Sequence, residues 1–258
     1  MIIAHLACHA VSLLACCLTC RSWYIAASPH LHHTLITPSY SNDNLWWPDS
    51  IRDMHKLGLF PLVKRFKFRG SLPFSPALLD LHILRQFSSL TNVQELRIAN
   101  LDIPGFMPEI QWYFNHFLPT VRSLGLERPM GSRRQIIFFI GLFPHLEDLE
   151  LRYEFSEFQG EPLDDPTLIP SFTPPLRGRL RMKYFKLVGI LEDMIGLFGG
   201  IRFHHMDLKG ICGAQLLLDA CAETLETLRF CPSDPHGERV SLEGVPDIYE
   251  QKFLSQTL

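Results

Sequence analysis

A six-residue pattern of apolar and variable positions recurs along most of the chain. Each copy has an apolar residue, two variable residues, a second apolar residue, one variable residue and a third apolar residue, as in Val63-x-x-Phe66-x-Phe68. The last three residues of each copy alternate as in a short strand with one buried face. The pattern therefore predicts seven short strands. Their copies begin at Val63, Val93, Val121, Leu146, Met182, Phe203 and Leu225.

Between the copies, apolar residues recur at the spacing of a helix. The clearest case follows Ser75-Pro76, a pair that suits the start of a helix. The four predicted helical segments are 77–90, 106–118, 133–143 and 213–222. The copies stand 21 to 36 residues apart, and leucine-rich repeats recur every ~20–29 residues. We therefore predict an α/β fold, a leucine-rich-repeat-like solenoid with a curved parallel sheet and outer helices.

The distribution of apolar and polar residues divides the chain into three predicted parts. Residues 1–40 are predicted to be a small helical segment, 41–61 a linker, and 62–258 the repeat domain. Five prolines preclude a helix in residues 153–181, which we interpret as an inserted loop, either an edge loop or a flap that contacts a partner. From about residue 232 we expect an irregular tail without a polar capping repeat.

The variable strand positions are candidates for a binding surface. They flank the inner apolar positions and should lie on the concave face, which solenoids commonly use for binding. The face is predicted to be basic at its amino end and mixed in sign afterwards, which suits a polar protein better than a nucleic acid. Solvated strand residues without a partner are the alternative. The candidate residues are Arg65, Lys67, Arg69, Glu95, Arg97, Asp148, Glu150, Arg152, Tyr184 and Lys186.

Composition narrows the class of protein. The chain has 258 residues, 47% of them hydrophobic, with 24 Lys and Arg against 27 Asp and Glu. This near-neutral balance argues against a general polyanion binder, and no apolar run is long enough to cross a membrane. Seven cysteines are too few for a disulfide scaffold and fit a reducing compartment, the cytoplasm or the nucleus.

The first twenty residues are apolar and contain several cysteines and histidines. No Lys or Arg precedes Arg21, which argues against a secretory signal. Cys17 and Cys20 have the spacing of half a zinc site, but a second ligand pair is missing. No βαβ pattern surrounds them, as a thioredoxin-like motif would require. We interpret these cysteines as small core residues and predict no metal and no cofactor.

Residues 12–23, SLLACCLTCRSW, resemble the second half of an F-box. The repeats resemble those of F-box and leucine-rich-repeat proteins of mushroom-forming (basidiomycete) fungi, as in FSSLTNVQELRI at 87–98. The Leu-Pro pair that opens an F-box is missing and residues 1–6 match only the end of the amphipathic helix that follows it, so the resemblance is to an F-box truncated at its N-terminus. The positions that match, and that the resemblance assigns to adaptor binding, are Leu13, Leu14, Leu18, Cys20, Arg21 and Trp23.

The resemblance implies the substrate-recognition subunit of an SCF-type ubiquitin ligase. Its F-box would bind the Skp-type adaptor of a cullin ligase, and its repeats would bind a protein target. The alternative is a stand-alone repeat scaffold whose degenerate F-box no longer binds the adaptor. Common catalytic motifs are absent from the sequence, so we expect no enzyme, and no nucleic-acid or membrane partner. A small helical cap is predicted to pack against the first repeat, near Phe66 and Phe68, through Leu13, Leu14, Leu18 and Trp23.

Overall fold

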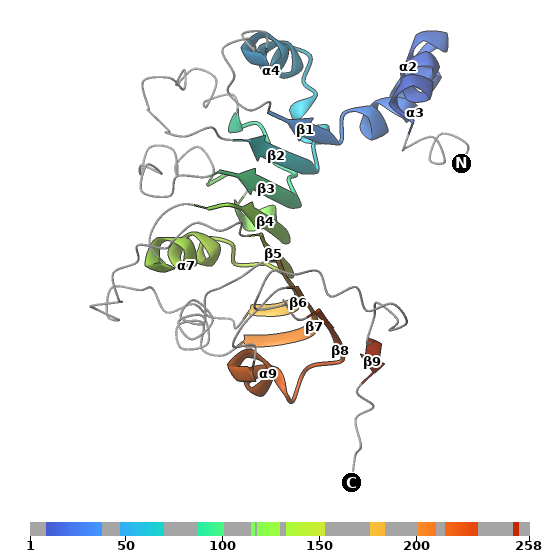
Figure 1. The fold of residues 1–258 in the computed structure, drawn as a ribbon. Helices are drawn as coiled ribbons and strands as arrows, with labels where there is room; N and C mark the ends of the chain where they lie inside the picture. The colour runs from blue at the N-terminus through green and yellow to red at the C-terminus, as the bar shows by residue number, and fades with distance from the viewer. Residues whose placement is uncertain are drawn as a thin grey trace, which may run out of the picture.

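The computed structural model describes residues 9–37, 47–69, 87–100, 115–116, 118–129, 133–152, 176–183, 201–209, 215–231 and 250–252. These residues form an α/β structure around one sheet, in which eight parallel strands lie side by side in chain order. A ninth strand pairs antiparallel with the eighth. Figure 1 shows the strands stacked from β1 at one end to β8 near the other, with a helix pair at the β1 end.

Within the described residues the strands are short and the helices few. The strands are β1 (Thr34–Ile36), β2 (Arg65–Arg69), β3 (Glu95–Ala99), β4 (Ser123–Glu127), β5 (Asp148–Arg152), β6 (Leu176–Lys183), β7 (Ile201–Lys209), β8 (Thr227–Cys231) and β9 (Glu250–Lys252). The α-helices are α2 (Ala10–Thr19), α3 (Arg21–Leu31), α4 (Trp47–Lys56), α7 (Arg133–Gly141) and α9 (Gln215–Cys221). Two 3-10 turns, η1 (Phe60–Leu62) and η2 (Leu118–Thr120), precede β2 and β4.

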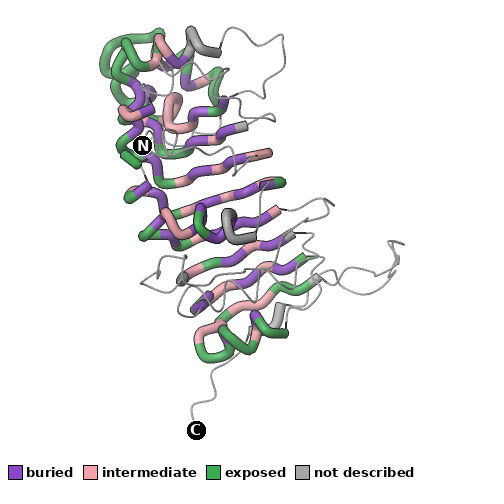
Figure 2. The backbone as a smooth tube through the Cα atoms, turned by 90° about the vertical axis from the view of Figure 1, so that its left-hand side faces the viewer, coloured by how far each residue is buried: buried purple, intermediate pink, exposed green. Residues whose placement is uncertain are grey.

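One face of the sheet carries the core. Burial alternates along the strands (Figure 2), because successive side chains point to opposite faces. The fourth and sixth pattern positions form two buried layers across the sheet, as with Leu124 beside Leu149 and Leu126 beside Leu151. Each buried leucine of this kind stabilises the fold by about 1.5–3 kcal/mol relative to an exposed one.

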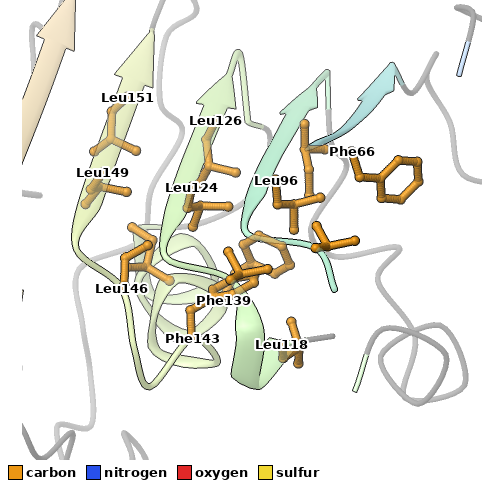
Figure 3. Close-up of a cluster of buried hydrophobic side chains, with 14 of the residues drawn as sticks. Phe66, Leu96, Leu118, Leu124, Leu126, Phe139, Phe143, Leu146, Leu149 and Leu151 are labelled. Carbon is orange, nitrogen blue, oxygen red and sulfur yellow. The ribbon is translucent and has the colours of Figure 1, made fainter. Parts of the chain in front are cut away.

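The described helices cover the apolar face of the sheet and not the opposite one. Phe139 of α7 and Phe143, just after this helix, lie beside the strand leucines (Figure 3), and their rings meet edge to face with centroids 5.4 Å apart. Ile51 of α4 and Leu217 of α9 belong to the same core. The described helices α4, α7 and α9 therefore all pack on the apolar side of the sheet.

The structure confirms the predicted strand register in six copies and corrects it in one. The fifth copy does not begin at Met182: Leu180 pairs with Leu149 and Met182 with Leu151, so Met182 occupies the last apolar position rather than the first. Strand β6 begins at Leu176, and the predicted insertion 153–181 extended too far toward the C-terminus. The first position of this copy is Arg177, a residue the apolar pattern excludes.

A glycine explains the irregular start of β6. The pairing of β6 with β7 shifts register between Gly178 and Arg179. Gly178 has a φ of +96°, and a Cβ there would lie 2.0 Å from the carbonyl oxygen of Glu147. Only glycine fits both this backbone conformation and this close approach.

The sheet contains a strand that the pattern did not predict. β1 lies within residues 1–40, which were expected to be helical, and pairs in parallel with β2. Leu35 stands beside Phe66 in the core, and the next inward residue is the buried Thr37, whose N–H donates to the oxygen of Lys67 at 2.9 Å. The apolar pattern did not predict β1, because Thr37 occupies a position where the pattern requires an apolar residue.

Two of the four predicted helices fall on described residues. α7 and α9 confirm the segments 133–143 and 213–222. The predicted helices over 77–90 and 106–118 lie largely outside the described residues, as does the tail from 232 apart from β9. α4 and η1 fall largely within the predicted linker 41–61.

The N-terminal helix pair has a small core of its own. Leu13, Cys16 and Ala27 are buried together between α2 and α3, apart from the main core. The prediction that Leu13 packs near Phe66 was wrong, because α3 covers this side chain instead. The other three residues of this prediction are not packed there either, since Leu14, Leu18 and Trp23 are 52%, 82% and 44% exposed.

Candidate functional site

The face of the sheet opposite the core is lined with polar and charged side chains, and we call it the charged face. It is built by the same alternation that buries the apolar residues, so each strand contributes two or three side chains to it. Among the described residues it carries eight Lys or Arg and five Asp or Glu. Its charged residues are Arg65, Lys67, Glu95, Arg97, Glu127, Asp148, Glu150, Arg152, Arg179, Arg181, Asp207, Lys209 and Arg229.

The structure brings most of the predicted site residues together on this face. Those of β2, β3 and β5 lie in neighbouring strands, with Arg69 at the end of β2 in register with Ala99. Tyr184 and Lys186 lie outside the described residues. The correct register of β6 instead places Arg179 and Arg181 on the charged face, which sequence reasoning missed. The alternation around buried Leu180 was the signal that could have found them.

Parallel register aligns the side chains in rows across the sheet. One row passes from Arg65 through Glu95, Ser123, Asp148, Arg179 and His205 to Thr227. The next row passes from Lys67 through Arg97, Gly125, Glu150, Arg181 and Asp207 to Arg229. Acids and bases alternate along much of both rows, so oppositely charged groups stand on adjacent strands.

Glu95 links two arginines at the amino end of the face. Its Oε2 lies 2.9 Å from Nε of Arg65, and its Oε1 accepts a hydrogen bond of 2.6 Å from Nε of Arg97. Burial alone would lower the pKa of Arg97, but this hydrogen bond and the charges of Glu150 and Glu95 outweigh it and raise the pKa. Both guanidinium groups are thereby held in place while charged.

Glu150 is the centre of the charged face. Its side chain is only 4% exposed, and Oε1 accepts a 2.6 Å hydrogen bond from Nε of Arg152. Its Oε2 lies 3.3 Å from Nη1 of Arg97 and 3.5 Å from Nη1 of Arg181. Burial would raise the pKa of Glu150, yet the Arg152 hydrogen bond and the three cations together lower it. The carboxylate therefore stays ionised under its arginines.

A second carboxylate extends the network toward β6. Asp148 Oδ2 accepts a 2.6 Å hydrogen bond from Nη2 of Arg181 and a weaker one of 3.3 Å from Oγ of Ser123. Arg181 thus contacts both acids of β5. From Arg65 to Arg181 the ion pairs form one continuous network of residues on β2, β3, β5 and β6 that passes over β4, with the alternating charges fixed by their neighbours.

Gly125 lets Arg97 reach Glu150. These two residues lie on β3 and β5, so the arginine side chain passes over the intervening strand β4 at Gly125. A Cβ at Gly125 would lie 3.2 Å from Cγ of Arg97. The missing side chain also leaves a depression of about 200 Å³, lined by Lys67, Arg97, Gly125, Glu127, Glu150 and Arg152 together with backbone and apolar neighbours from β2 to β4.

The charges without a partner on this face are mostly positive. Among the described residues of the charged face, Lys67, Arg179 and Lys209 have no ion-pair partner. Asp207 is the corresponding unpaired acid, with a buried Oδ1 that accepts no hydrogen bond. The face thus has an excess of cations although the whole chain has a net charge of −3.

The positions that match the F-box lie in the helix pair and divide into two groups. Leu13 is buried against α3, whereas Leu14, Leu18, Cys20, Arg21 and Trp23 are exposed. Val11, Leu14 and Leu18 are 85%, 52% and 82% exposed and are spaced by three and four residues, which places them on one side of α2. The helix therefore has two apolar sides, one packed and one open.

The described residues also bear on metal binding, membrane insertion and cysteine reactivity. They contain no group of three or more His, Cys, Asp or Glu side chains that could hold a metal ion, and no helix that could cross a membrane. The thiol of Cys221 is buried, which raises its pKa, and it donates to the oxygen of Ile201. A thiol in this state is a poor nucleophile.

Comparisons with known proteins add no functional assignment to these structural features. The chain matches no family model, and neither the curated proteins nor the solved structures contain one that is significantly similar to it.

Proposed function

We propose that the protein is a protein–protein interaction module of the kind found in SCF-type ubiquitin ligases. Its helix pair would bind a Skp-type adaptor, and its charged face would bind a target protein. The observation that carries the proposal is the charged face, an ordered set of ion-paired side chains that no described helix covers. Ordered charges of this kind favour selective association, because wrong partners bring like charges together.

Regular backbone contacts support a repeat solenoid as the architecture. Four successive carbonyl oxygens each accept two N–H groups from the start of the next strand, at 2.7–3.0 Å. The acceptors are His33, Lys64, Gln94 and Arg122. Each unit thus meets the next through the same contact, as expected where neighbouring repeats bury one another's apolar face.

The open side of α2 supports adaptor binding. Val11, Leu14 and Leu18 expose a row of aliphatic side chains, and Tyr24 and Ile25 at the start of α3 are 44% and 61% exposed. Large exposed apolar side chains that gather on one short element commonly mark a protein interface. Polar residues at these exposed positions would cost the helix pair nothing in packing, since its own core lies on the other side of α2.

A titration of the full chain with a purified fungal Skp-type adaptor tests the proposal. We expect a saturable complex by isothermal titration calorimetry, which Leu18→Asp abolishes because it places a charge in the apolar contact. Leu216→Asp is the matched control, since Leu216 is 44% exposed on α9, far along the chain from the helix pair. If the wild-type chain and the control do not bind the adaptor, the stand-alone scaffold replaces the ligase subunit.

A further inference from the structure

We propose that the depression over Gly125 receives a carboxylate side chain from an acidic segment of the target protein. This inference rests on the proposed function and names the chemistry of the partner at the charged face. The depression lies where β2 to β5 are adjacent, so a segment that crosses the strands would pass directly over it.

The size of the depression suits a side chain of a partner. Sites for cofactors and small molecules occupy about 300–1,000 Å³, and the depression measures about 200 Å³. It lies on an open sheet face rather than between two layers, so the rest of the ligand must lie outside it. A single side chain that projects from a longer segment meets both conditions.

The charge of the lining selects an anion. Arg97 and Arg152 are already paired with Glu150, and Glu127 lies 3.8 Å from Arg128. Lys67 is the one charged residue of the lining that no described side chain neutralises. The uncompensated charge of the depression is therefore positive.

The arginines of the lining are held in place before any partner arrives. Nε of Arg97 is bound to Glu95 and Nε of Arg152 to Glu150, both at 2.6 Å. These contacts fix the two long side chains on either side of Gly125. An incoming carboxylate therefore meets guanidinium groups whose conformational entropy is already reduced, and this preorganisation favours binding.

The charged face continues the same preference beyond the depression. Arg179 on β6 and Lys209 on β7 have no ion-pair partner, in contrast to the acids Glu95 and Glu150. A segment with several carboxylates could place one in the depression and others near these cations. Long-range attraction would accelerate the encounter and weaken as salt is added.

Gly125 is needed for space rather than for its backbone. Its φ is not in the left-handed region, unlike those of Gly58 and Gly178. Its Cα lies under the Arg97 side chain, with room for the depression above it. A valine at this position would fill the depression and crowd the Arg97 side chain without changing any charge, whereas Lys67→Gln removes the unpaired charge without filling it.

Fluorescence anisotropy with defined peptides tests the inference on the full chain. The probe is a labelled peptide of alternating glutamate and serine, and its control has glutamine in place of glutamate. We expect the acidic peptide to bind and the glutamine peptide not to bind. Lys67→Gln should weaken binding by about fivefold, the effect of one partly exposed charge pair, and Gly125→Val by about tenfold or more. Lys56→Gln removes a more exposed cation from α4, on the apolar side of the sheet, and should bind like the wild type.

Three results would overturn the inference. They are no binding of the acidic peptide to the wild-type chain, equal binding of the glutamine peptide, and equal effects of Lys67→Gln and Lys56→Gln. Lys67→Gln breaks no described ion pair, so the inference can be tested even if Gly125→Val disturbs the sheet. The adaptor titration uses the helix pair and not this face, so its outcome separates failure of the inference from failure of the proposed function.

Discussion

Replacing Glu150 by glutamine should destabilise the sheet, because Glu150 neutralises three arginines. The carboxylate is 4% exposed and contacts Arg97, Arg152 and Arg181. Glutamine keeps the shape and one acceptor oxygen but loses the charge. The arginines would then repel one another above an almost buried amide.

The expected cost follows from how the three arginines are placed. Breaking one partner of a fully buried ion pair costs about 3–5 kcal/mol. Here the arginine side chains are 27–41% exposed, and two of them keep a second acid, Glu95 for Arg97 and Asp148 for Arg181. Solvent screening and these remaining partners reduce the expected loss to about 2 kcal/mol.

Urea unfolding of the wild-type and Glu150→Gln chains, followed by circular dichroism, measures this loss. Glu127→Gln is the matched control, because Glu127 is 45% exposed on the adjacent strand and pairs loosely with Arg128 at 3.8 Å. It should lose less than about 0.5 kcal/mol. If Glu150→Gln costs no more than Glu127→Gln, the ion-pair network does not stabilise the sheet as described.

Further predictions concern pH, glycine and the core. The pKa of Glu150 is lowered in the folded state, so its contribution to stability is complete above its unfolded pKa of about 4.3 and is lost as pH falls through the lower folded value. The stability difference between wild type and Glu150→Gln should therefore vanish in urea titrations at acid pH. A difference that stays constant with pH would contradict this. Gly178→Ala should lower the unfolding free energy, measured with urea, by more than about 3 kcal/mol, because its Cβ would overlap the Glu147 carbonyl. Gly58→Ala, at a φ of +65° in open space, should cost about 1 kcal/mol. Similar costs for the two variants would refute the close approach at Gly178. Leu149→Ala should lower the unfolding free energy by about 2–5 kcal/mol and the half-exposed Leu14→Ala by much less, and the reverse order would contradict the assigned core.

The sequence predicted the sheet well where the apolar pattern was complete. Strands β2 to β5, β7 and β8 have the expected register, because a period of two fixes which side chains face the core. It failed at β6, where Met182 was taken as the first position although Arg177 holds that place and Gly178 carries a register shift. It also missed β1, whose inner positions are Leu35 and the polar Thr37.

The site was predicted only in outline for a similar reason. Alternation indicates which face a side chain occupies, but not how far it reaches across neighbouring strands. The contact of Arg97 with Glu150 over Gly125 depends on the alignment of three strands distant in sequence. The helix pair shows the same limit. Both sides of α2 are apolar, and only the position of α3 decides that Leu13 is buried and Leu18 exposed.

Hydrogen exchange of the full chain, with and without the Skp-type adaptor, tests the proposed interaction module most directly. We predict slower exchange over α2 and α3, residues 10–31, on adaptor binding, and unchanged exchange in strands β2 to β5, which would remain open to a target. Protection of those strands, or no change over residues 10–31 at saturating adaptor, would contradict the proposal that the helix pair binds the adaptor and the charged face binds the target.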